Sequence, residues 1–235
     1  MASQVKNTSM TIMVPAYNEE KHIEKVTLKL LKSLKKYFKR YEIIIFDDCS
    51  KDKTYEITER LAKKYKEVRV VHNNPNKGIG YNYKQGIKLA KTEYFMYFPG
   101  DGSKEPVEHV LKEVGRADVL IPYIDNQNER SILRRTISES YTGFINLLFG
   151  LKVKYYNGFV VSKLKYTKKL HLVTDSFSLQ TEVVVKLLKK GSTYYHIPYK
   201  AVPQAKTGIF KWRNIKGVIK SIALLFWNVR IKKKY

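Results

Sequence analysis

The sequence has 235 residues, of which 43% are hydrophobic and 12 are glycine, and this composition excludes a disordered or fibrous chain and allows one large domain. The formal net charge is +24, and residues 131–235, with 21 basic and 3 acidic side chains, carry +18 of it. This excess favours an anionic partner, either a membrane face or a polyanion, although a basic face that contacts only water is the simpler alternative.

Short apolar runs alternate with helical patterns from residue 10 to residue 121. The apolar runs predict strands at 10–14, 41–46, 68–71, 93–98 and 118–121, and the segments between them predict helices at 18–38, 50–65, 80–91 and 106–115. The run at 41–46 is rich in isoleucine, as in a strand that is covered on both faces. This alternation predicts an α/β domain with a mostly parallel sheet and right-handed crossovers.

The second half of the chain contains two further long helical patterns. They predict helices at 131–149 and 178–190, and Gly191 should end the second one as a C-cap. No internal repeat or low-complexity linker interrupts the chain. We therefore expect one domain over residues 1–212 and a basic amphipathic helix over residues 213–235.

This last segment combines apolar and basic side chains. Its apolar residues recur at helical spacing: Ile215, Val218, Ile219, Ile222, Leu225, Phe226 and Val229. Trp227 and six basic residues accompany them: Lys216, Lys220, Arg230, Lys232, Lys233 and Lys234. Such a helix is typical of a segment that lies in an anionic membrane surface. The alternative is a helix that packs on its own domain or on a partner's helix.

Three features indicate the compartment. Cys49 is the one cysteine, so no internal disulfide can form, as is usual in a reducing environment. The amino terminus lacks the apolar run of a secretory signal, and the longest late apolar run, 222–227, is far shorter than the roughly 20 residues that a spanning helix needs. We expect a cytoplasmic protein peripheral to a membrane, which leaves room for a separate membrane-anchoring subunit.

Acidic loops follow three of the predicted strands. Residues 14–20 read Val-Pro-Ala-Tyr-Asn-Glu-Glu, residues 47–54 read Asp-Asp-Cys-Ser-Lys-Asp-Lys-Thr, and Asp101 lies between two glycines in the third loop. In an open α/β sheet such loops line one crevice, where carboxylates repel unless a sugar hydroxyl, a base or a metal ion lies between them. The glycines would let a diphosphate or a divalent cation approach closely. The simpler alternative is a pair of helix caps.

The order and spacing of these motifs resemble the family 2 glycosyltransferases of GT-A fold. The resemblance includes the loops at 14–20 and 47–54, Asn-Lys-Gly-Ile-Gly at 76–80, and the acidic loop before Pro106. Further matches resemble the subgroup that loads sugars onto polyprenyl phosphates, including dolichol-phosphate mannosyltransferases: Arg134-Arg135-x-x-Ser138, Gln180-x-Glu182, Ile197-Pro198-Tyr199 and Lys206-Thr207-Gly208. The similarity covers about residues 9–213 and implies a Rossmann-like, mostly parallel sheet with a helical C-terminal elaboration.

The resemblance implies a role for each matching position. A GDP- or UDP-sugar would be bound by Pro15, Tyr17, Asn18, Glu19, Asp47, Asp48, Lys77 and Gly78. Asp101 would be catalytic and hold Mg or Mn against the diphosphate, where the cation neutralises charge on the departing nucleotide. Arg134 and Ser138 would also be catalytic, on a helix that faces the acceptor. The acceptor phosphate would be bound by Arg134, Arg135, Lys206 and Lys211, with an exposed helical face as the alternative for the arginine pair.

The sequence departs from the family pattern at the metal and at the acceptor. Pro99 stands where the family has the first carboxylate of Asp-x-Asp, and Ser103 replaces the subgroup's usual glutamine. The missing metal ligand would come from elsewhere or from water, or the cation would bind more weakly. Lys206 replaces an arginine and keeps its charge without the bidentate fork. These departures leave the identity of the substrates less determined than the reaction type.

Protonation separates two candidate acceptors. A sugar hydroxyl needs a general base to attack an anomeric carbon, whereas a phosphate monoester is already an anion near neutral pH. After residue 130 the sequence has three carboxylates, Glu139, Asp175 and Glu182. This scarcity favours inverting transfer of a hexose to a polyprenyl phosphate. The second candidate is a sugar hydroxyl in cell-surface glycan assembly, with Asp175 or Glu182 as the acceptor-site acid. Glu182 is otherwise expected as a buried partner of an arginine.

Other residues receive simpler interpretations. The five histidines show no metal-ligand spacing and are expected at the surface or at strand edges. The 18 tyrosines accompany no nucleic-acid-binding module, so a nucleic-acid partner is not expected. Cys49 replaces a glycine that is frequent in the family, and we assign it no chemistry. A GT-A domain that binds an anionic ligand without turnover is the alternative of another class.

Overall fold

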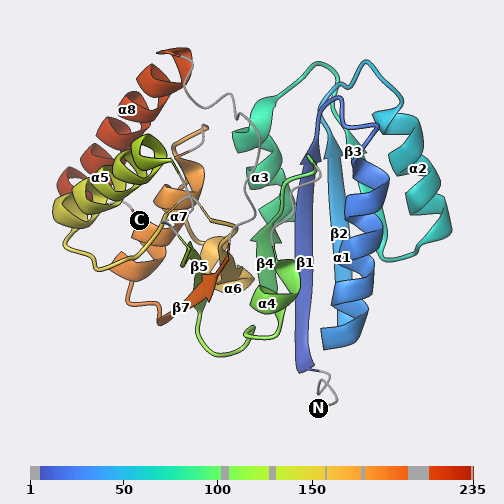
Figure 1. Ribbon diagram of the computed structural model, residues 1–235, viewed down its shortest axis with the longest axis horizontal. Helices are drawn as coiled ribbons and strands as arrows, with labels where there is room; N and C mark the ends of the chain where they lie inside the picture. The colour runs from blue at the N-terminus through green and yellow to red at the C-terminus, as the bar shows by residue number, and fades with distance from the viewer. Residues whose placement is uncertain are drawn as a thin grey trace.

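The computed structural model describes residues 6–101, 106–126, 131–156, 158–175, 178–200, 212–233 and 235 (Figure 1). Within these residues one sheet has seven strands, which are β1 (Lys6–Ala16), β2 (Phe38–Asp47), β3 (Val68–His72), β4 (Tyr94–Tyr97), β5 (Val119–Ile124), β6 (Val161–Lys163) and β7 (Tyr194–Tyr199). The α-helices are α1 (Ile23–Tyr37), α2 (Thr54–Lys64), α3 (Gly78–Leu89), α4 (Val107–Leu111), α5 (Ile132–Phe149), α6 (Leu164–Thr167), α7 (Leu179–Lys189) and α8 (Trp212–Phe226).

The sheet is mostly parallel, as the alternation of strands and helices predicts. Its strand order is β3-β2-β1-β4-β6-β5-β7, and within the described strands β6 alone runs antiparallel to its neighbours, β4 and β5. The predicted elements omit β6, α6 and β7. Strand β6 has three residues and helix α6 has four, which is too short for a periodicity, and β7 contains Pro198. The helix predicted at 106–115 is shorter than expected, because α4 ends at Leu111.

Helices cover both faces of the sheet and form a core on each side. Side chains alternate along β2, so that Ile43 and Ile45 pack against α1, α2 and α4 in one core. Ile44 and Phe46 point to the opposite face and pack in a second core with α3, α5, α6, α7 and α8. A strand buried on both faces explains why residues 43–46 are continuously apolar.

The strand order places a topological switch at β1. The chain proceeds outward from β1 to β2 and β3, and it then crosses to the other side of β1 to form β4. In open α/β sheets the crevice beside such a switch, at the carboxyl ends of the strands, is the usual ligand site. The fold therefore brings the acidic loops after β1, β2 and β4 to one edge.

The carboxyl-terminal helix packs partly on its own domain. Helix α8 continues into a single π-helical turn at Trp227–Ile231, and Leu225 and Val229 are buried in the second core. Leu224 and Trp227 lie on the other side of the helix and are exposed. In the part of the chain that the structure describes, no helix has the length and hydropathy to span a bilayer. The division of the chain at residue 212 stays a prediction.

Candidate functional site

The loops after β1, β2 and β4 lie side by side at the carboxyl edge of the sheet. The backbone N–H of Asp48 donates to Ala16 O over 2.9 Å, and that of Phe98 donates to Met13 O over 2.9 Å. A Cβ atom on Gly100 would lie 2.6 Å from Pro15 O, so the approach of these two loops requires glycine. Asp101 is thereby held beside the end of β1.

The polar residues of the first two loops bind each other and do not begin helices. Asn18, at φ 57°, accepts a hydrogen bond from Lys51 N at 2.8 Å on Oδ1 and donates its own N–H to Ser50 Oγ at 3.0 Å. Helix α1 begins only at Ile23 and α2 only at Thr54. The predicted helix starts at Asn18 and Ser50 are therefore wrong, and neither of these two residues caps a helix.

A second set of hydrogen bonds joins the same two loops. Glu19 N–H donates to Thr54 Oγ1 over 2.7 Å, and the Thr54 hydroxyl donates to Asp52 Oδ1. Burial opposes ionisation of Asp52, but hydrogen bonds from the Thr54 hydroxyl and from the N–H groups of Thr54 and Glu20 outweigh it and hold the pKa of Asp52 below its ordinary value. The ionised Asp52 therefore links the loop after β1 to the start of α2.

Replacement of Asp52 by Asn should destabilise the protein in a pH-dependent way. Folding lowers the Asp52 pKa, so its stabilising contribution is complete above the ordinary value of 3.8 and disappears as the pH falls through the folded-state value. Urea denaturation should show a lower free energy of unfolding for Asp52→Asn at pH 6, and the difference from the wild type should shrink below pH 3.8. The exposed Glu56→Gln is the control. A difference that stays constant down to pH 2 would contradict this role.

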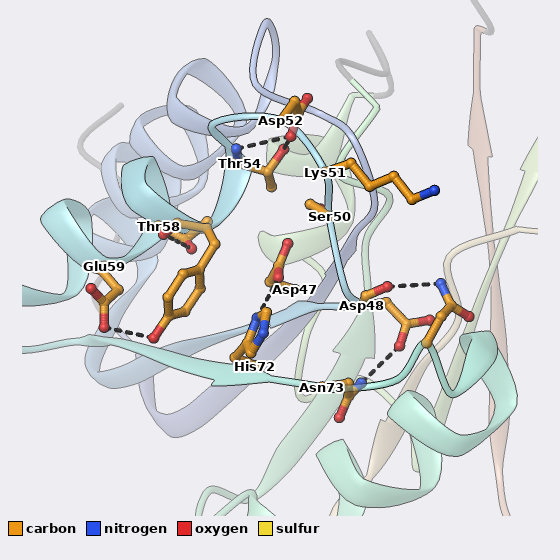
Figure 2. Close-up of polar contacts among 12 residues, drawn as sticks. Asp47, Asp48, Ser50, Lys51, Asp52, Thr54, Thr58, Glu59, His72 and Asn73 are labelled. Carbon is orange, nitrogen blue, oxygen red and sulfur yellow. Dashed lines mark hydrogen bonds and ion pairs between the residues drawn. The ribbon is translucent and has the colours of Figure 1, made fainter.

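Asp48 organises the loop between β3 and α3. Its carboxylate is 5% exposed and accepts hydrogen bonds on Oδ1 from Lys77 N and on Oδ2 from Gly78 N, each at 2.8 Å. Asn73 Nδ2 donates to the same carboxylate over 2.8 Å, as Figure 2 shows. Three predicted site residues, Asp48, Lys77 and Gly78, are thus brought together. The predicted contact of Asp48 with a base or ribose stays a prediction.

Asp47 reaches the other side of β2 and binds His72. The Asp47 side chain is fully buried, and its Oδ2 lies 2.6 Å from His72 Nδ1 (Figure 2). The His72 ring packs against Tyr55, with 4.4 Å between the ring centroids. Sequence patterns did not indicate these contacts of His72, because a strand-end histidine pairs with the neighbouring strand and not with residues close in sequence.

The carboxylates of Glu19 and Asp101 influence each other electrostatically. Burial raises the pKa of Glu19, and the nearby Asp101 carboxylate raises it further. Burial likewise raises the pKa of Tyr97, with a further contribution from Asp101. Asp101 itself is exposed. The sequence predicts carboxylates that repel each other at this edge. A cation or a sugar hydroxyl between Glu19 and Asp101 would relieve this repulsion.

The residues of this crevice fit a divalent cation that a ligand helps to hold. Asp101 offers hard oxygen atoms, which Mg²⁺ and Mn²⁺ prefer. In the ranges that the structure describes, no group of three or more His, Cys, Asp or Glu side chains could hold a metal by itself. Magnesium is commonly bound by one or two carboxylates together with substrate phosphates. A diphosphate would therefore have to complete the coordination.

The predicted acceptor residues lie on α5, which follows the carboxyl end of β5. Arg134 is half-buried, Ser138 is buried, and Arg135 Nε lies 2.9 Å from Glu139 Oε1. Strand β5 is antiparallel to β6, and β6 is antiparallel to β4, so α5 begins at the same edge as the acidic crevice. Lys206 and Lys211 lie outside the described residues.

The two candidate acceptor-site acids have different surroundings. Glu182 is fully buried and lies 2.8 Å from Lys186 Nζ, so it is the buried partner of a basic side chain, which is lysine and not arginine. Its carboxylate also accepts from the backbone N–H groups of residues 173 and 174. Asp175 is 71% exposed and lies 2.6 Å from Lys84 Nζ on α3. Of the two, only Asp175 is accessible to a substrate.

The sequence matches the family described as Glycosyl transferase family 2 over residues 11–183. The chain belongs to glycosyl transferase family 2. It is 28% identical over 198 residues to protein MJ0544 of Methanocaldococcus jannaschii, covering 78% of this chain and 83% of that protein. It is 30% identical over 144 residues to the dolichyl-phosphate beta-glucosyltransferase ALG5A of Trichomonas vaginalis, covering 55% of this chain and 45% of that enzyme. This family 2 glycosyltransferase thus spans less than half the length of the ALG5A enzyme.

Solved structures confirm the GT-A fold of this family 2 glycosyltransferase. Glucosyl-3-phosphoglycerate synthase from Mycobacterium tuberculosis, in complex with uridine diphosphate, matches 94% of this chain and 80% of that chain, with a TM-score of 0.70 and 11% identity. Mannosyl-3-phosphoglycerate synthase from Rubrobacter xylanophilus matches 96% of this chain and 75% of that chain, with a TM-score of 0.74 and 12% identity. The mycobacterial enzyme has also been solved with Mn²⁺ and uridine diphosphate.

Proposed function

We propose that this family 2 glycosyltransferase moves a hexose from a UDP- or GDP-sugar to a polyprenyl phosphate, with inversion, at the cytoplasmic face of a membrane. The donor would occupy the crevice at the switch between β1 and β4. The acceptor phosphate would lie between that crevice and the first turns of α5. The enzyme would act at an anionic membrane surface, and a separate membrane-anchoring subunit is a compatible partner.

The electrostatic interaction between the Glu19 and Asp101 carboxylates supports the proposed binding of a nucleotide sugar. The nearby Asp101 charge adds to burial in raising the pKa of Glu19, and a divalent cation would balance the negative charge of the two carboxylates. Mg²⁺ or Mn²⁺, when bound at Asp101, would neutralise charge that develops on the departing nucleotide. The loop after β1 would contact the nucleotide through Tyr17, which is 47% exposed. Pro15 beside it is half-buried.

One observation carries the choice of acceptor: every carboxylate after residue 130 is paired with a basic side chain. Glu139 binds Arg135, Asp175 binds Lys84, and Glu182 binds Lys186. In each pair the carboxylate oxygen is already turned toward a basic side chain of the protein and not toward a bound hydroxyl. A phosphate monoester needs no base to become a nucleophile. The pairing therefore favours an anionic acceptor over a sugar hydroxyl.

The direct test is transfer from labelled nucleotide sugars. The purified chain is incubated with Mn²⁺ or Mg²⁺, with UDP-glucose or GDP-mannose in turn, and with a polyprenyl phosphate or a soluble sugar acceptor. We expect a lipid-linked hexose of inverted configuration, identified by mass spectrometry and NMR. Absence of a lipid-linked product with every donor contradicts the proposal. A product on the soluble sugar that is lost in Asp175→Asn would favour the hydroxyl acceptor.

The role proposed for Arg134 predicts a selective kinetic defect. Arg134→Gln should raise KM for the polyprenyl phosphate about 10- to 100-fold, because a charged hydrogen bond to phosphate is lost, while nucleotide affinity stays unchanged. Arg134→Lys should recover part of the loss. Arg60→Gln, which breaks an exposed pair with Glu24, is the matched control and should match the wild type. An unaltered acceptor KM in Arg134→Gln would remove this residue from the acceptor site.

A further inference from the structure

Helix α5 presents an apolar face to solvent. Five large hydrophobic side chains on it are exposed: Ile132 (83%), Leu133 (64%), Ile137 (44%), Phe144 (49%) and Leu147 (79%). Thr136, Ser140 and Gly143 are the exposed residues between them on this side, and the exposed charges of the helix, Arg135 and Glu139, pair with each other at the edge of this face. The opposite side buries Ile145 and Phe149 in the second core. An amphipathic surface helix would instead have a polar outer face.

The carboxyl-terminal helix presents a second apolar face. Leu224 (39%), Phe226 (36%), Trp227 (52%) and Ile231 (54%) are exposed there, while Leu225 and Val229 on the other side are buried. Exposed basic residues accompany the apolar ones, namely Lys220, Arg230, Lys232 and Lys233. This combination of Trp, aliphatic and basic side chains is typical of helices that lie at the boundary of headgroups and acyl chains.

The two helices lie on the same flank of the molecule. Figure 1 shows α5 and α8 at the left, outside α7. Leu225 and Val229 share the second core with Ile145 and Phe149, and Arg230 Nε donates to Leu148 O over 2.9 Å. We call the five exposed apolar residues of α5, together with Leu224, Phe226, Trp227 and Ile231, the docking face. So many large exposed hydrophobic side chains on one flank mark an interaction site.

Charge selects the occupant of the docking face. Residues 131–235 carry +18, and their three carboxylates are all paired with basic side chains. A second copy of the chain would bring together the exposed Lys220, Arg230, Lys232 and Lys233 of both copies, which like-charge repulsion opposes. An anionic bilayer offers both an apolar interior for the leucines and Trp227 and negative headgroups for the lysines.

We propose that α5, together with the carboxyl-terminal helix, docks on an anionic bilayer through this docking face. The inference deepens the proposed function, on which its link to a lipid acceptor rests. Helix α5 follows the carboxyl end of β5, at the edge of the sheet that also carries the acidic loops, and its outer face continues to Leu147. Contact along α5 would therefore set the crevice next to the headgroup layer, where the phosphate of a polyprenyl phosphate resides.

Vesicle sedimentation of the full chain, without substrates, tests the docking face. The probes are phosphatidylcholine vesicles with and without phosphatidylglycerol. We expect the wild type to bind the anionic vesicles, and the double variant Leu133→Ser/Leu147→Ser to bind them at least about tenfold more weakly, because two exposed leucines no longer enter the bilayer. Leu28→Ser, at 39% exposure on α1 across the sheet, should bind as the wild type does.

Melting temperatures of the variants should equal that of the wild type, since these side chains are exposed. Wild-type protein that ignores anionic vesicles, or a double variant that binds them normally, overturns the inference. So does a wild-type dimer in sedimentation velocity that Leu147→Ser dissociates, because a second copy would then occupy the face. Transfer to a short-chain, water-soluble polyprenyl phosphate should persist in the double variant. If the wild type shows no transfer to this soluble acceptor, the proposed function is contradicted, but the vesicle-binding result still stands.

Discussion

Replacement of Asp101 by Asn should lower kcat/KM for sugar transfer about 100- to 1000-fold, the range expected when a group that stabilises transition-state charge is removed. Asn keeps the shape of the side chain and an oxygen ligand but loses the negative charge that binds a divalent cation. Asp101 is exposed, so the melting temperature should change little. Initial rates over a range of Mn²⁺ concentrations would show a raised metal requirement.

Asp101→Asn should also change the pKa of Glu19, which gives a second readout for the same variant. Loss of the Asp101 charge should lower the raised pKa of Glu19, because one of its two main causes disappears. Glu24→Gln on the first turn of α1 removes a carboxylate near the crevice loops but outside them, and it should leave kcat/KM unchanged. If Asp101→Asn retains more than about a third of wild-type activity, a charge at this position is not part of the catalytic machinery.

Glu182→Ala should be the most destabilising single substitution among those considered. Both Glu182 and Lys186 are fully buried, and removal of the carboxylate leaves Lys186 as an unpaired charge in the second core. Breaking a buried pair in this way costs about 3–5 kcal/mol, which corresponds to a fall of about 10 °C in melting temperature for a domain of this size. Differential scanning calorimetry and urea denaturation measure both quantities.

A double-variant cycle separates the ion pair from the hydrogen bonds of Glu182. Glu182→Met/Lys186→Met removes both charges and should recover at least about 1 kcal/mol relative to the sum of the single variants. Glu182→Gln keeps an oxygen that can accept from Val173 N and Thr174 N and should lose less stability than Glu182→Ala. Additive losses in the cycle would contradict a coupled pair.

Much of the sheet could be predicted, because its central strands follow simple rules. Strands β1 and β2 are apolar on both faces, and the helices after them have clear apolar stripes, so the pattern of residues 10–65 indicates each element. The residues at which these elements begin and end were harder to predict. Polar residues such as Asn18 and Ser50 are typical helix caps, and local sequence does not show that a neighbouring loop will take their hydrogen bonds instead.

The proximity of some candidate-site residues could be predicted, but the hydrogen bonds that join them could not. Asp48, Lys77 and Gly78 are assigned to one site by resemblance, whereas the bond from Asn73 to Asp48 depends on the register between β2 and β3. The positive φ of Cys49, 66°, gives a physical reason for the glycine that is frequent at that position. The Glu182–Lys186 pair had a sequence signal, since oppositely charged residues four apart meet on a helix.

The hydrogen bonds between the crevice loops have a consequence for the energetics of ligand binding. Backbone N–H groups of Lys51, Lys77 and Gly78 are already fixed by side chains of other loops before any ligand arrives. A nucleotide that enters such a crevice loses translational and rotational freedom, but the protein walls have little conformational entropy left to lose. The proposed donor site is therefore preorganised, and recognition there should approach rigid-body docking rather than induced fit.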